Sequence, residues 1–273
     1  MTQSRIMKKS LDFLLQLLDR DFFLSKRQIL FAALTLLIIG VGLRCGYWTM
    51  RDRPPRDEIF YIQAVENINS NDPAWLEKYN YFGPLMPLAA ASVCRFGIAP
   101  ETALRTLNVV YSSLWLLIMF FLCYEVFSSS AIGLLGMMLA VFNPYSIRMS
   151  CQILREPLYL LIFTVSLWLA VRFIKNQGSN LLYPLLLAGL TVLGFFTRYE
   201  GIEISLFLPL AIIVILMQCK WQRIRICIYG LAVYLFTVGL IVGALINFNN
   251  IYMRNANQKA IEYIKLFSSN RWQ

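Results

Sequence analysis

The chain lacks histidine entirely and carries little charge. Of its 273 residues, 15% are charged and 58% are hydrophobic, whereas in soluble domains about a quarter of the residues are charged. Without imidazole groups, acid–base chemistry must use carboxylates, tyrosines, cysteines or lysines. The six cysteines form no C-x-x-C pair, so the spacing of a zinc site is missing too.

Period-two alternation is also absent, and long continuous apolar runs are present instead. Such runs predict helices rather than the strands of a membrane barrel. Each run is long enough to cross roughly 30 Å of hydrocarbon as a helix. We therefore expect an all-α polytopic membrane protein with about seven transmembrane helices, at residues 28–48, 107–126, 131–147, 157–174, 181–197, 201–218 and 226–248.

Basic residues cluster before the first predicted span, after the fourth and after the sixth. With seven spans these three clusters lie on one side, so the positive-inside rule places the N-terminus in the cytoplasm and the C-terminal tail outside. We expect a multi-pass protein of the plasma (inner) membrane. The net charge of +10 fits these topology signals and contacts with anionic lipids. It predicts no nucleic-acid binding, because no basic stretch is interleaved with stacking aromatics.

The predicted organisation is a single membrane domain over residues 1–273. Residues 1–27 have leucines at helical spacing and form either an amphipathic cytoplasmic lead or a frayed tail. Residues 49–106 make the first external loop, where we expect surface helices from Asp57 and over 85–94. Residues 249–273 form an external tail.

Several ionisable residues fall on the predicted outer side and could converge there. Each has a plain structural alternative: Asp57 as a helix cap, Glu156 before Pro157 as a helix start, and Arg198 paired with Glu200. The functional hypothesis depends on the prediction that they all lie on the same side of the membrane. Charges at membrane depth are costly unless they pair or face a polar cavity. The set is Arg44, Asp57, Glu58, Arg105, Arg155, Glu156, Arg198 and Glu200.

A series of short motifs resembles the C-type membrane glycosyltransferases, close to the protein O-mannosyltransferase and aminoarabinose-transferase group. Asp57-Glu58 with Tyr61 resembles the D-E-x-x-Y of the first external loop in that group. The other similar segments follow in the same order: 81–88 with Gly83-Pro84, Glu101–Arg105, Arg155-Glu156-Pro157, and Gly194–Gly201 with its Thr-Arg-x-Glu-Gly turn.

The resemblance implies transfer of a sugar from a polyprenyl-phosphate-linked donor to a lipid, glycan or protein acceptor at the outer face. Asp57 would be the general base and Glu58 its catalytic companion, with Arg105 and Arg198 on the phosphate. The expected substrate contacts are Tyr61, Lys78, Arg105, Glu156, Arg198 and Glu200.

Three points stay open from the sequence. A divalent metal is possible, but the carboxylate spacing identifies no metal site. The family usually continues beyond the length of this chain, so a second polypeptide could supply further spans. The alternative function is a non-catalytic membrane protein, either a transporter, a flippase component or an assembly partner derived from a truncated transferase.

Overall fold

The computed structural model describes residues 25–49, 56–72, 83–219 and 224–247, and 87% of these residues are helical, without strands. The all-α prediction is therefore confirmed for the described part. The helices are α2 (Lys26–Thr49), α3 (Arg56–Asn69), α5 (Leu85–Cys94), α6 (Pro100–Phe127), α7 (Ser130–Phe142), α8 (Pro144–Ser150), α9 (Glu156–Lys175), α10 (Leu182–Thr197), the 3-10 helix η2 (Tyr199–Leu206), α11 (Phe207–Cys219) and α12 (Ile224–Asn247).

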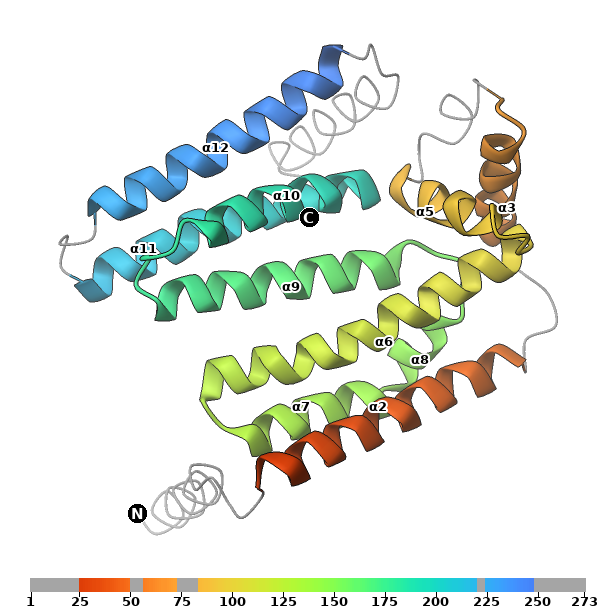
Figure 1. Cartoon of the computed structure of the whole chain (residues 1–273), viewed down its shortest axis with the longest axis horizontal. Helices are drawn as coiled ribbons and strands as arrows, with labels where there is room; N and C mark the ends of the chain where they lie inside the picture. The colour runs from red at the N-terminus through yellow and green to blue at the C-terminus, as the bar shows by residue number, and fades with distance from the viewer. Residues whose placement is uncertain (1–24, 50–55, 73–82, 220–223, 248–273) are drawn as a thin grey trace, which may run out of the picture.

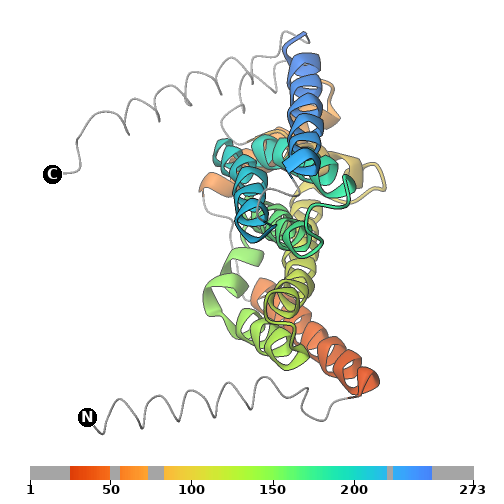
Figure 2. The same ribbon diagram turned by 90° about the vertical axis from the view of Figure 1, so that its left-hand side faces the viewer.

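The long helices lie side by side in a row, each running roughly opposite to the one before it (Figure 1). Turned by 90°, the same helices are seen nearly end-on, stacked from α2 and α7 through α6, α9 and α10 to α12 (Figure 2). A row leaves each helix with outward-facing sides, and apolar side chains such as Phe31, Met217 and Phe236 are exposed on them. In a membrane protein these side chains face lipid, as the low charge of the chain predicts.

Among the described residues, four helices are long and apolar enough to cross a membrane: α2, α6, α9 and the segment Tyr199–Gln218. The bent pair α7–α8 makes a fifth if it is one span. The shorter apolar helices include α10, whose 16 residues reach only about 24 Å. The protein is thus a helical membrane protein, while seven spans and their orientation remain predictions.

The predicted span 131–147 is not continuous, because α7 ends at Phe142 and α8 follows at an angle of 63°. Pro144 cannot extend the helix, since it lacks an N–H and disfavours helical geometry at Asn143. The Asn143 side chain instead accepts hydrogen bonds from the backbone N–H groups of Tyr145 and Ser146 and caps α8. The break therefore follows from Asn143-Pro144, which hydropathy averages over.

The helix predicted over 107–126 in fact begins at Pro100, a residue type that is favoured at the first position of a helix. Arg105, placed by the sequence in the external loop, lies instead in the second turn of α6. Hydropathy alone places the start of a span after the last charged residue. The proline at the first helical position shows that the helix begins earlier. The short loop helix expected over 85–94 is present as α5, and the helix expected from Asp57 is α3.

A hydrophobic cluster joins α3, α5, α6, α9 and η2 at one end of the row. Its fully buried members include Tyr61, Met86, Leu104, Ile153 and Ile204. These residues come from five segments far apart in sequence, so this packing fixes the mutual positions of the elements that carry the predicted site. In Figure 1, α3 and α5 lie at this end, where α6 begins and α10 ends.

Candidate functional site

Arg198, Glu156 and Glu200 form an ion-pair cluster, as the sequence placed them on one side. Arg198 Nε lies 3.2 Å from Glu200 Oε2, and Arg198 Nη2 lies 3.3 Å from Glu200 Oε1. Arg198 Nη1 lies 3.3 Å from Glu156 Oε1, and the guanidinium stands 5.5 Å from the centre of the Tyr159 ring. The planar fork of arginine suits this two-carboxylate arrangement.

The pairing decides the charge of this cluster. Burial would lower the pKa of Arg198, but the hydrogen bond to Glu200 and the charges of Glu200 and Glu156 raise it above the ordinary arginine value. Arg198 is shared by two carboxylates, and the charge of Arg155 also acts on Glu200, so the hydrogen-bonding groups of Arg198 are largely used within the cluster. The alternative of an Arg198–Glu200 pair is confirmed, whereas the predicted phosphate contact of Arg198 stays a prediction.

Arg105 differs from Arg198 because only part of its guanidinium pairs with other groups. It is 3% exposed, and its Nη2 lies 2.8 Å from Glu101 Oε1, one helical turn earlier. Its Nε and Nη1 are buried and have no hydrogen-bond partner in the described part of the chain. A buried donor without a partner costs about 1–3 kcal/mol, and more for a charged group. These two nitrogens therefore keep unused hydrogen-bonding capacity next to a positive charge.

Asn108 extends this polar face of α6 and was not identified from the sequence. It is fully buried, and its Nδ2 donates to the carbonyl oxygens of Gln152 and Leu154 at 2.5 and 3.0 Å. These bonds hold the loop before Glu156 against α6. The signal was present in the spacing of Glu101, Arg105 and Asn108, which places polar groups on one helical face.

The carboxylate pair of α3 is divided between two environments. Asp57 is exposed and Glu58 is 1% exposed, although the two are adjacent in the first turn. Acidic residues in a first turn interact favourably with the helix dipole, so the helix-start role foreseen for Asp57 is compatible with its position. Only Asp57 is accessible for proton transfer to or from a substrate in this arrangement.

Tyr61 lies in the core rather than on a substrate surface. It is buried, and burial raises the pKa of its hydroxyl, which lies near Arg155, Glu156 and Arg198. Tyr61 therefore stays protonated and anchors α3 to the start of α9. Burial closes the Tyr61 hydroxyl to a substrate in this arrangement, and its predicted role as a substrate contact stays a prediction.

Two glycines allow the backbone approaches that shape this end of the molecule. Gly83 has φ +76°, and a Cβ there would lie 2.7 Å from the carbonyl oxygen of Phe196. At Gly201 a Cβ would overlap the Gly194 carbonyl and lie 2.5 Å from the Phe195 nitrogen. Both contacts are with backbone atoms, so no side-chain adjustment can relieve them.

Arg44 forms a second polar cluster deeper along the helices. It is completely buried and donates to Ser112 Oγ (3.1 Å), the Gly40 carbonyl (2.9 Å) and Ser146 Oγ (3.3 Å). No carboxylate pairs with it within the described part of the chain. Instead of snorkelling to an interface, Arg44 ties α2 to α6 and α8.

Several predicted features cannot be located in the described part of the structure. Lys78, the cytoplasmic lead up to residue 24 and the tail 249–273 lie outside the described residues. Among the described residues, no group of three or more cysteines or carboxylates gathers at metal-binding distance. The question of a divalent metal therefore stays as the sequence left it.

Comparison with protein-family models, curated proteins and solved structures found no match for this chain.

Proposed function

We propose that this protein is a membrane glycosyltransferase that moves a sugar from a polyprenyl-phosphate-linked donor to an acceptor hydroxyl at the outer face. The motif order described above motivates the reaction class. The observation that carries the proposal is the buried Arg105 guanidinium with two unpartnered nitrogens. A phosphate oxygen is the kind of acceptor that satisfies such donors strongly, through charge-assisted hydrogen bonds.

In the proposed reaction the acceptor oxygen forms a bond to the anomeric carbon of the sugar. The bond between that carbon and the phosphate oxygen breaks, and its electron pair leaves with polyprenyl phosphate. Asp57 takes the proton of the acceptor hydroxyl, which its exposed position on α3 permits. Arg105 stabilises the leaving phosphate, whose negative charge grows during bond cleavage.

Glu156 is the proposed contact to a sugar hydroxyl. Its Oε1 is held by Arg198, and its Oε2 is buried with no hydrogen-bond partner among the residues that the structure describes. Arg198 and Glu200 then orient Glu156 rather than contact the phosphate. Lys78 is retained as a candidate contact from the sequence alone, and Glu58 and Tyr61 hold α3 in place.

A non-catalytic assembly partner is the second candidate, because the closed pairing of Arg198 also fits a purely structural cluster. An assay with the purified protein in lipid vesicles distinguishes the transferase from the assembly partner. The test supplies polyprenyl-phosphate sugars carrying mannose, glucose or aminoarabinose and measures donor binding, then release of polyprenyl phosphate with acceptors added.

The informative variant is Arg105→Gln, with Arg95→Gln as its control. Arg95 follows α5 at the same end and is exposed. Losing hydrogen bonds to a charged group costs about 1.5–3 kcal/mol, so Arg105→Gln should bind donor at least about tenfold more weakly. Arg95→Gln should stay within about twofold of wild type. Folded wild-type protein that binds none of the donors would refute the transferase and leave the partner role.

A further inference from the structure

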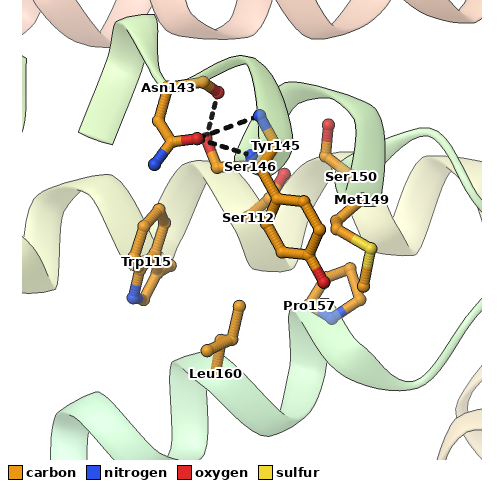
Figure 3. A pocket seen from close by; sticks show the side chains of 9 residues that line it. All are labelled: Ser112, Trp115, Asn143, Tyr145, Ser146, Met149, Ser150, Pro157 and Leu160. Carbon is orange, nitrogen blue, oxygen red and sulfur yellow. Dashed lines mark hydrogen bonds between the residues drawn. The ribbon is translucent and has the colours of Figure 1, made fainter. Parts of the chain in front are cut away.

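The two ends of the row of helices differ in charge. The cavity of about 220 Å³ between α6, α8 and α9 has no charged side chain among the described residues that line it (Figure 3), so charge selects no ligand there. At the end of the row where α6 and α9 finish and α2 and α12 begin (Figure 1), the described residues include a single carboxylate, Glu125, against five cations. Such an excess of positive charge favours an anionic partner. The cations are Lys26, Arg27, Arg172, Lys175 and Arg225.

Arg172 and Lys175 share Glu125 across the contact between α9 and α6. Arg172 Nε lies 3.2 Å from Glu125 Oε2, and Lys175 Nζ lies 3.9 Å from Glu125 Oε1. Lys175 Nζ also donates to Ser128 Oγ at 3.0 Å. Within the described part of the chain neither Nη nitrogen of Arg172 makes a hydrogen bond, and its side chain is 43% exposed. The planar end of this guanidinium therefore remains open to an acceptor from outside the protein.

The last carbonyl groups of α9 do not take up these cations. The backbone N–H groups of residues 176–178 donate to the carbonyl oxygens of residues 172–174 at 2.9 to 3.0 Å. Arg172 and Lys175 are thus not needed to cap the helix, although its dipole favours their charge. Two cations and one carboxylate leave the cluster with one positive charge in excess.

An aromatic layer lies one helical turn closer to the middle of the row. Phe121 precedes Glu125 by four residues on α6, which is about 6 Å along the helix. Trp168 precedes Arg172 by the same number on α9, and the Phe121 and Trp168 ring centres are 6.0 Å apart. The Arg172 guanidinium stands 5.3 Å from the centre of the Trp168 ring. Phe121 is 43% exposed, so apolar surface continues directly below the charges, as at a membrane interface.

We propose that the cluster of Glu125, Arg172 and Lys175 binds the phosphate of an anionic diacyl phospholipid, with one acyl chain against Phe121. The Nη groups of Arg172 suit two phosphate oxygens at once, and Lys175 adds a second positive charge. The excess charge favours phosphatidylglycerol over phosphatidylcholine, because the choline group is itself a cation. The inference does not depend on the proposed function, since the cluster lies about 30 Å from Arg105 along α6.

The test uses the full chain in phosphatidylcholine vesicles that contain a small fraction of photoreactive phosphatidylglycerol, with a diazirine in the acyl chain next to the glycerol ester. Labelling should map to peptides containing Phe121 or Trp168, and unlabelled phosphatidylglycerol should displace it. Arg172→Gln should lower the labelling at least about fivefold, as expected for one charge at a membrane surface. Arg225→Gln removes the same charge from an exposed position at the same end, and it should stay within about twofold of wild type. Equal labelling of these two variants would overturn the proposal.

Glu125→Gln distinguishes a lipid site from an ion pair that only ties α6 to α9. In the purely structural case Glu125→Gln and Arg172→Gln break the same pair, so labelling should change in the same direction. In a headgroup site Glu125 competes with the phosphate, so Glu125→Gln should raise the labelling at least about twofold. Lys175→Gln removes the more weakly paired cation and should lower it, which keeps the test valid where Arg172→Gln fails to fold. A loss of labelling in Glu125→Gln, or none in Lys175→Gln, would contradict the proposal.

The competitors identify the ligand. Displacement by added phosphatidylcholine as effective as that by phosphatidylglycerol would reduce the contact to bulk lipid and refute a selective site. Displacement by inorganic phosphate in the vesicle buffer would assign the cluster to a soluble anion and refute the lipid. Labelling that maps outside α6 and α9 would refute the position of the site. Donor binding at Arg105 is measured separately, so each of these results leaves the proposed function as it stands.

Discussion

Gly201→Ala should loosen the turn between α10 and η2, and the cost in unfolding free energy can be worked from the backbone contacts. The new Cβ would overlap the Gly194 carbonyl and lie 2.5 Å from the Phe195 nitrogen, whereas ordinary contacts are 3.4–4 Å. The η2 segment must therefore move away from α10 by about 1 Å. Overpacking of this kind costs about 1–3 kcal/mol.

Gly189→Ala, in the same helix α10, is the matched control. A Cβ at Gly189 meets nothing within 4 Å, and the change should stabilise the fold by about 0.4–1 kcal/mol because it restricts the unfolded chain. The two alanine variants should thus differ by roughly 1.5–4 kcal/mol in unfolding free energy. Denaturant titration of both variants in one lipid–detergent mixture measures the difference.

The displacement should also reach the ion-pair cluster, since Arg198 lies between Gly194 and Gly201. A movement of about 1 Å breaks the 3.3 Å contact between Arg198 and Glu156. Partly exposed pairs contribute only about 0.2–1 kcal/mol, so the coupling is small but measurable in a double-mutant cycle. Glu156→Gln should cost less in Gly201→Ala than in wild type. Equal stability of Gly201→Ala and Gly189→Ala would refute the reasoning.

Three further predictions concern the site and the topology. Asp57→Asn should lower the transfer rate about 10²–10⁴-fold with donor binding unchanged, whereas Glu58→Gln should mainly lower the unfolding free energy, since Glu58 is buried; near-normal transfer by Asp57→Asn removes it as the base. Arg198→Lys should weaken donor binding in the vesicle assay because lysine cannot reproduce the fork to Glu200. Wild-type binding by that variant would remove Arg198 as the residue that orients Glu156 for the donor. A single cysteine placed at exposed Asn71 should react with an impermeant reagent added from outside the cell, and labelling from the cytosolic side alone would invert the topology.

Much of the helix content could be predicted from the long continuous apolar runs, because a lipid-exposed backbone must satisfy its own hydrogen bonds. The predicted runs 28–48 and 157–174 correspond closely to α2 and α9. Boundaries set by proline were less well predicted. Pro100 starts α6 seven residues before the predicted span, and Pro144 divides the third span in two.

The candidate site was predictable as a set of residues but not as a set of roles. Sidedness placed Arg105, Glu156, Arg198 and Glu200 at one end of the molecule. It could not show that Arg198 is occupied by two carboxylates while two nitrogens of Arg105 are buried without partners. That difference depends on side-chain distances between segments far apart in the chain.

By itself, the sequence determined that this is a helical membrane protein without imidazole chemistry, because composition and hydrophobic periodicity act locally along the chain. Only the tertiary structure decided that Glu58 and Tyr61 are buried while Asp57 is exposed. Only packing brought Arg44 onto Ser112 and Ser146, residues 68 and 102 positions away. Burial and hydrogen-bond satisfaction are properties of the packed helices together, and no single helix encodes them.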